Sequence, residues 1–159
     1  MIRLHRLLAL VGVLATLTAC ISAPPAPPPA PVDTTTPAQR LALIEREAGV
    51  DDTELSVQPL RDPQVDDLRE TAKAKRQIGD LAAAAAALDQ ALGLVSGDPA
   101  ILQERAEVAV LQGDWNASER FAKQAIELGS KTGPLCRRHW ATIEQARLAR
   151  GEKENAASA

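Results

Sequence analysis

One short run of residues holds the side chains best suited to catalysis. Cys136 and His139 stand three positions apart, so a helix would place them close to one face. Arg137 and Arg138 lie between them, and positive charge near the start of a helix lowers the pKa of a thiol. The cluster raises the hypothesis of a thiol-dependent redox or hydrolytic protein. The structural alternative makes Cys136 a small buried side chain and His139 a residue at the core boundary.

The cluster lacks the further groups that known catalytic and metal sites need. No motif supplies a third residue to orient a Cys–His pair, and the other histidine, His5, lies in a segment predicted below to be removed. Four zinc ligands are not available. The acidic residues match no calcium loop, and no phosphate-binding or Ser-His-Asp signature occurs. We therefore expect no enzyme, no metal and no bound cofactor, and we interpret these acidic residues as solvated helix faces: Glu45, Glu47, Asp51, Asp52, Asp66, Asp67 and Glu70.

The start of the chain has the organisation of a secretory signal. Arg3 and Arg6 precede an apolar run from Leu7 to Leu17. A helix of this length measures about 16 Å, too short for a hydrocarbon core of roughly 30 Å. A basic start, a short apolar core and small residues before a cut indicate a signal peptide rather than a membrane-spanning helix.

The residues that follow the apolar core point to covalent attachment of lipid. Leu17-Thr18-Ala19-Cys20 resembles the lipobox of bacterial lipoproteins. The resemblance implies that residues 1–19 are removed, that a diacylglycerol is attached to the Cys20 thiol, and that the new amino group is acylated. In the alternative, the protein is an ordinary secreted one in which Cys20 is incidental.

Composition excludes some partners and folds. Removal of Arg3 and Arg6 with the signal leaves 16 basic and 21 acidic side chains, a net charge of −5, which argues against nucleic acid. The aromatic side chains are few, whereas alanine, the best helix former, is abundant. The remaining cysteine, Cys136, has no partner for a disulfide within the mature chain. An all-α protein is expected.

A proline-rich linker separates the lipid site from the first predicted helix. The linker, residues 20–36, belongs to a proline-rich stretch that favours extended polyproline II and reaches roughly 55 Å from Cys20 to Pro37. Thr36 and Gln39 form a capping-box pattern for a helix that begins at Pro37 and that Gly49 ends. We expect an N-terminal helix and an extended connector over residues 37–62, with Leu55, Val57 and Leu60 lying on the domain.

Helix-start and turn signals then repeat along residues 63–151. Asp62-Pro63 and Asp98-Pro99 each pair an N-cap with a proline, and the turns Gly79-Asp80 and Gly113-Asp114 are 34 residues apart. The pattern predicts two helical hairpins and then a further helix from Pro134 to about Arg150. Residues 152–159 are expected to be a polar, frayed tail.

A period of 34 residues in this arrangement resembles the tetratricopeptide repeat. Small residues stand where that family packs its helices closely: Ala72, Gly79, Ala84 and Ala91, then Ala106, Gly113, Ser118 and Ala125. The spacing from Trp140 to Gly151 matches the first helix of a third unit. The chain departs from the family pattern at positions where the family carries large aromatic residues, because Leu68 and Leu102 stand at two of them. The resemblance implies a short helical-hairpin solenoid, and residues 36–48 are expected to cover its front end.

The resemblance also implies a concave groove lined by the first helix of each hairpin. Its mildly basic lining would suit a peptide segment that carries carboxylates, although the same residues could be solvated helix surface. Trp140 is a candidate interface anchor for a partner or for a second copy in a homodimer, and its alternative is packing inside its own domain. The groove residues are Arg69, Lys73, Arg76, Gln103, Glu107, Val110, Arg138, Gln145 and Leu148.

Together these features predict a lipid-anchored adaptor or scaffold of a Gram-negative envelope. Ile21 and Ser22 after Cys20 carry no inner-membrane retention signal of the enteric type, which favours the outer membrane with the domain facing the periplasm. The expected partner is an envelope protein, such as a cell-wall enzyme, a secretion component or a pilus-assembly component. The alternatives are the thiol-dependent protein described above and a self-associating structural spacer.

Overall fold

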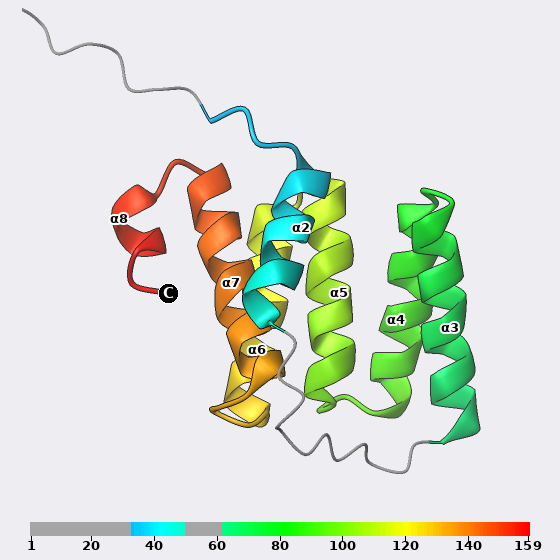
Figure 1. Ribbon diagram of the computed structural model, residues 1–159. Helices are drawn as coiled ribbons and strands as arrows, with labels where there is room; N and C mark the ends of the chain where they lie inside the picture. Colours follow the sequence, from blue (N-terminus) through cyan, green and yellow to red (C-terminus); the bar gives the residue numbers. More distant parts are fainter. Residues whose placement is uncertain (1–32, 50–61) are drawn as a thin grey trace, which may run out of the picture. The chain divides into compact units, whose positions relative to one another are not determined.

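The computed structural model describes residues 33–49 and 62–159, and these residues fold as helices without strands. The predicted signal peptide, Cys20, most of the predicted linker and the predicted connector with Leu55, Val57 and Leu60 lie outside the described residues. The all-α prediction is confirmed. Figure 1 shows the helices in chain order: α2 Pro37–Ala48, α3 Pro63–Gln77, α4 Leu81–Leu94, α5 Pro99–Gln112, α6 Trp115–Leu128, α7 Pro134–Ala149 and α8 Lys153–Ala156.

The helices begin where local capping chemistry predicts. Thr36 and Gln39 form the complete capping box at the start of α2, and Pro37 stands at its first turn. Aspartate side chains cap the next four helices by accepting hydrogen bonds from backbone N–H groups of the first turn. Gly113 ends α5 in the left-handed region, at a φ of 73°, which a residue with a side chain rarely adopts. The chain then turns directly into Asp114 and α6.

Two antiparallel hairpins and a fifth helix stack in sequence. α3 packs on α4, α5 packs on α6, and α7 packs on α6 and α5. Small side chains make the close approaches, as Ala72, Ala84 and Ala91 are buried in the core of the first hairpin together with Val65 and Leu88. The predicted helical-hairpin solenoid is confirmed.

The N-terminal helix lies elsewhere than the sequence predicted. α2 was expected to cover the front end of the array, beside the first hairpin. It packs instead on α5 and α7, at the other end of the stack (Figure 1). Its apolar face explains the position, because Leu41 and Ile44 form one buried cluster with Val110 of α5 and Ala141 of α7. α2 therefore covers part of the face that the first helices of the hairpins present.

The C-terminal tail also differs from its prediction as a frayed segment. It forms the short helix α8 against α7, with Ala156 buried. The turn before it is held by Arg150, which forms ion pairs with Glu119 of α6 and with Glu152. Arg147 adds a second pair to Glu119. Against the opposing effect of burial, hydrogen bonds from Lys123, Arg150 and Arg147 lower the pKa of the Glu119 carboxyl to about 2. α8 thus covers part of α7, which has no full second helix packed on it.

The close packing of α4 makes Ala91 a position where added volume should be destabilising. Ala91 is fully buried, so we expect Ala91→Leu to overpack the first hairpin and to lower the free energy of unfolding by about 1–3 kcal/mol. Ala86 stands on the exposed face of the same helix, so Ala86→Leu is the matched control. Urea denaturation of both variants checks the prediction. Equal stability of the two would contradict the packing of α4 described here.

Candidate functional site

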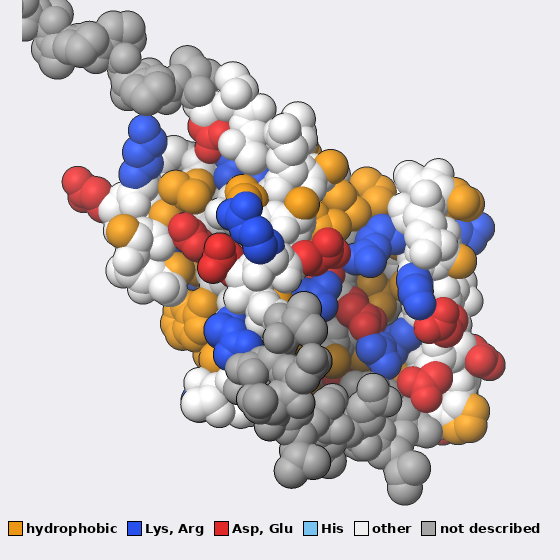
Figure 2. Space-filling view, viewed as in Figure 1, with side chains coloured by type: hydrophobic (Ala, Val, Ile, Leu, Met, Phe, Trp, Pro, Cys, Tyr) orange, Lys and Arg blue, Asp and Glu red, His pale blue; other side chains and the backbone are white. Residues whose placement is uncertain are grey.

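A cleft opens between α3 and α5, with one side chain of α7 at its inner end. Its volume is about 560 Å³, within the range of clefts that hold small ligands. The helices α3 and α5 are not among the closely packed pairs, and ion pairs link them across the cleft. Figure 2 shows basic and acidic side chains interleaved on this face. The lining residues are Asp66, Arg69, Glu70, Ala72, Lys73, Arg76, Leu88, Glu104, Glu107, Val108 and Arg138.

The floor of the cleft holds a fully buried carboxylate. Glu107 has no exposed surface, and its oxygens lie 3.3 Å from Arg76 Nη1 and 2.7 Å from Arg138 Nη2. Burial raises the pKa of the Glu107 carboxyl, while the charges and hydrogen bonds of its partners oppose that rise. The two arginine side chains are each about a third exposed, at 30% for Arg76 and 31% for Arg138. The carboxylate therefore fixes two cations at the surface of the cleft.

A polar network beneath the floor fixes the orientation of these groups. Gln103 Nε2 donates to Glu107 at 2.8 Å and to Thr142 Oγ1 at 2.9 Å, so its Oε1 must act as the acceptor. The Nδ1 atom of His139 lies 2.6 Å from that oxygen and therefore carries the proton. Thr142 in turn donates to the backbone oxygen of Arg138. The network links the buried centre of α5 to α7, which supplies Arg138.

The other end of the cleft is acidic. Arg69 of α3 binds Glu104 of α5 through two nitrogens, Nε at 3.0 Å and Nη2 at 2.5 Å. Hydrogen bonding to Glu104 raises the pKa of Arg69, which remains a cation. Asp66 and Glu70 stand on the same wall, 55% and 74% exposed. Asp66 and Glu104 both pair with the Arg69 guanidinium, and Glu70 adds a third carboxylate on the same helix, so this end carries net negative charge.

Comparison with known proteins gives one informative match. No family model matches the chain, and no curated protein matches it. A solved structure, the globular C-terminal domain of Pseudomonas aeruginosa LpoP, aligns with 30% sequence identity and a TM-score of 0.59, over 62% of this chain and 93% of that domain. This chain belongs to the family of the LpoP C-terminal domain. The match is to nearly the whole of the LpoP domain, whereas the tetratricopeptide resemblance stays a prediction.

The LpoP-like domain brings together most of the predicted groove residues. Arg69, Lys73, Arg76, Glu107 and Arg138 all line the cleft. The predicted mildly basic lining is, in the structure, evenly balanced between cations and carboxylates. Asp66 and Glu70, which the sequence led us to interpret as solvated, are part of it, and Glu104 was not predicted at all. Glu104 could have been found from its position one turn before Val108 on α5, opposite Arg69. Ligand binding by these residues stays a prediction.

The remaining predicted groove residues lie under other side chains. Gln103 is buried below Glu107, and Val110 is buried against α2. Gln145 is buried beneath Arg40, which donates to both its backbone and its side-chain oxygen. Leu148 is only partly buried.

Arg40 is the anchor of α2 that sequence reasoning missed. It is 3% exposed and lies over the ring of Trp115 at 5.7 Å, and it also pairs with Asp33. One signal of this role was present in the sequence: Arg40 is a charged residue directly before Leu41, where the apolar face of the helix begins.

The Cys136 cluster does not meet the requirements of a thiol enzyme. Cys136 is buried, although the hypothesis needed an exposed thiol. The two arginines expected to activate it serve other groups, since Arg137 donates to the backbone oxygen of Ala48 at the end of α2 and Arg138 binds Glu107. The first contact places a cation at the C-terminal end of a helix, where the macrodipole favours it. In the described part of the chain, no group of His, Cys, Asp and Glu side chains could hold a metal ion.

Trp140 is partly exposed and lies apart from the cleft. It is 41% exposed and lines a shallow hollow of about 470 Å³ with Glu47 of α2 and the C-terminal Ser158 and Ala159. Its role as an interface anchor, and the homodimer it would support, stay predictions. Over the described ranges 33–49 and 62–159, no helix is both long and apolar enough to span a bilayer.

The buried His139 predicts a loss of stability in mild acid. Burial, with a smaller contribution from the charge of the adjacent Arg138, lowers the pKa of His139 to about 4. An unfolded chain takes up this proton near pH 6.5, so the folded state loses up to about 3 kcal/mol as the pH falls from 6.5 to 4. The contribution of neutral His139 to the free energy of unfolding is fully present above pH 6.5. Urea denaturation across this range measures it.

His139→Asn is the control for that titration. Asparagine keeps an N–H donor for Gln103 but cannot titrate, so its stability should fall less between pH 6.5 and 4 than that of the native protein. Carboxylates such as Glu119 contribute equally to both curves. Parallel curves for the two proteins would contradict the assignment of a neutral, buried His139.

Proposed function

We propose that this protein is a lipid-anchored adaptor of the bacterial envelope that holds a partner protein through its LpoP-like domain. In this proposal, Cys20 carries the lipid in the outer membrane, and the domain faces the periplasm. The match to the LpoP domain carries the proposal, because it covers 93% of that domain at 30% identity. The lipobox-like sequence before Cys20 supports the anchor independently.

The physical properties of the chain agree with such a role. A proline-rich linker that reaches roughly 55 Å allows the domain to meet partners away from the membrane surface. The excess of acidic over basic side chains argues against nucleic acid. The described residues present an open, charged cleft on a rigid helical array, an arrangement suited to binding an exposed segment of another protein. Of the partner classes considered, we put the enzymes that build the cell wall first, on the likeness to LpoP.

Site-specific photo-crosslinking in cells tests the proposal. A photoreactive amino acid at Glu70 would sit on the cleft wall, and the same amino acid at Gln124 would sit on the exposed face of α6. We expect a cell-wall enzyme to be cross-linked from position 70 and not from position 124. A secretion or pilus component in its place would reject the partner class, and no envelope protein from either position would reject the adaptor function.

A further inference from the structure

Basic and acidic side chains alternate over the face of the cleft, but its net charge changes sign along its length. Near the end of α3, Lys73 and Arg76 join Arg138 around the single carboxylate of Glu107, so this end carries two net positive charges. We call it the basic pole. Nearer the start of α3, Asp66 and Glu104 pair with Arg69, and Glu70, which pairs with Lys73, adds a third carboxylate, so the residues of this end carry two net negative charges. We call it the acidic pole.

Buried polar groups hold the cations of the basic pole in position. Glu107 and Gln103 are buried below it, and the hydrogen-bond network through Thr142 fixes the α7 backbone at Arg138. Arg76 and Arg138 line the cleft, and each side chain is about a third exposed. Lys73 is 58% exposed and pairs with Glu70, at 3.7 Å along the same helix. A carboxylate that entered the cleft could therefore reach cations that are already positioned.

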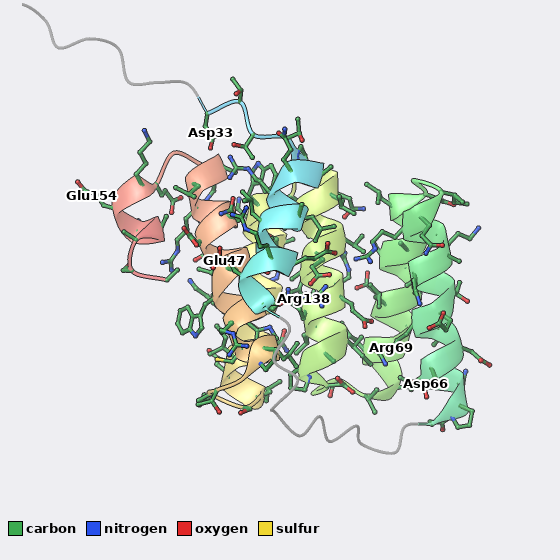
Figure 3. The ribbon with its side chains drawn as sticks, viewed as in Figure 1. Asp33, Glu47, Asp66, Arg69, Arg138 and Glu154 are labelled. Carbon is green, nitrogen blue, oxygen red and sulfur yellow. The ribbon has the colours of Figure 1, made fainter. Side chains whose placement is uncertain are left out.

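The separation of the poles sets the geometry of a complementary ligand. Asp66 and Lys73 are seven residues apart on one helix, which corresponds to about 10 Å along its axis. Figure 3 shows Asp66 and Arg69 toward the first turns of α3, with Arg138 nearer α5 and α7. An extended peptide advances about 3.3 Å per residue, so about three residues cover the same distance. A volume of about 560 Å³ accommodates a short segment rather than a folded domain.

We propose that the cleft binds an extended segment of the partner protein that carries an acidic and a basic side chain about three residues apart. The acidic side chain meets the basic pole at Lys73 and Arg76, and the basic side chain meets the acidic pole at Asp66 and Glu104, with Lys73 and Asp66 setting the spacing. This inference rests on the proposed adaptor function and names the chemistry that the partner presents. It extends the sequence-based expectation of a peptide segment that carries carboxylates, because the acidic pole favours a basic side chain in the same segment.

Selection from a library of random twelve-residue peptides displayed on phage tests the inference with the full-length mature protein in detergent. We expect enrichment of sequences with an acid and a base three positions apart, and weaker binding as salt concentration rises. Affinity of the enriched peptides is then measured by fluorescence polarisation. Selection of no sequence, or of sequences without the charge pair, would overturn the inference.

Charge reversal at each pole separates a dipolar ligand from an acidic one. Lys73→Glu and Asp66→Lys each replace an exposed side chain whose ion pair lies on its own helix, so neither should disturb the fold. Each should weaken the enriched peptides about tenfold, because attraction at one pole becomes repulsion. Arg46→Glu makes a similar charge change on α2, outside the cleft, and should leave the affinity unchanged.

The two charge-reversal variants also reveal whether the ligand is purely acidic. If the ligand is purely acidic, Lys73→Glu weakens it while Asp66→Lys strengthens it, and the inference is overturned. Equal affinity for the native protein and both variants would overturn it as well. In either case, cross-linking of a cell-wall enzyme from position 70 would leave the adaptor function standing, so failure of the ligand chemistry and failure of the function are distinguishable.

Discussion

Glu107→Ala is expected to lower the free energy of unfolding by about 3 kcal/mol. Removal of one member of a buried ion pair typically costs about 3–5 kcal/mol, because the remaining charge loses its partner without regaining water. Arg76 and Arg138 are partly exposed and can turn toward solvent, which places the expected loss at the lower end of that range. Gln103 also loses an acceptor inside the core. Urea denaturation at pH 7 measures the change.

Two further substitutions make the Glu107 experiment specific. Glu107→Gln retains a hydrogen-bond acceptor for Gln103 and removes only the charge, so its loss should be smaller than that of the alanine variant. Glu127→Ala removes an exposed glutamate on α6 and should change stability by less than about 0.5 kcal/mol. If Glu107→Ala were as stable as Glu127→Ala, the buried ion cluster would not be the element that holds α3, α5 and α7 together.

Cys20→Ser is expected to abolish lipid attachment altogether. In the proposed anchor the Cys20 thiol accepts the diacylglycerol, and serine at that position offers no thiol. Without acyl chains the protein loses the means of stable membrane anchoring, which takes at least two lipid or charge signals. Labelling of cells with a fatty-acid probe should give no signal from the variant, and fractionation should move it out of the membrane.

Cys136→Ser provides the matched control for the anchor, since the chain contains only these two cysteines. Cys136 is buried between helices, so its replacement should leave lipid labelling intact. Normal labelling of the Cys20→Ser protein would refute the lipobox interpretation and, with it, the proposed outer-membrane location.

The local features of the fold were predictable because their causes act over a few residues. The capping box at Thr36 and Gln39 and the aspartates before four helices satisfy backbone groups of the adjacent turn. Small residues such as Ala84 and Ala91 indicated close helix contacts because a hairpin pairs helices that are neighbours in the sequence. The periodic signals therefore predicted the two hairpins and the helix that follows them.

The site was predictable only in part. The family pattern placed Arg69, Lys73 and Arg76 on one face of α3, and Arg138 on the facing side, and all four line the cleft. It could not show that Glu104 pairs with Arg69, because the two lie 35 residues apart and no local rule couples their side chains. The division of the cleft into two poles follows from such pairs across helices.

By itself, the sequence determined the helical class, the hairpin boundaries and the lipobox-like start, since each depends on neighbouring residues. Only the tertiary structure decided where α2 lies, because its apolar face could have covered either end of the array. The contact of Arg40 with Gln145 joins residues 105 positions apart. Tertiary packing likewise assigned Arg137 to α2 and Arg138 to Glu107, and it buried His139 in its neutral form. Those outcomes depend on which distant surfaces meet, and the energy of such a contact cannot be evaluated until both partners are in place.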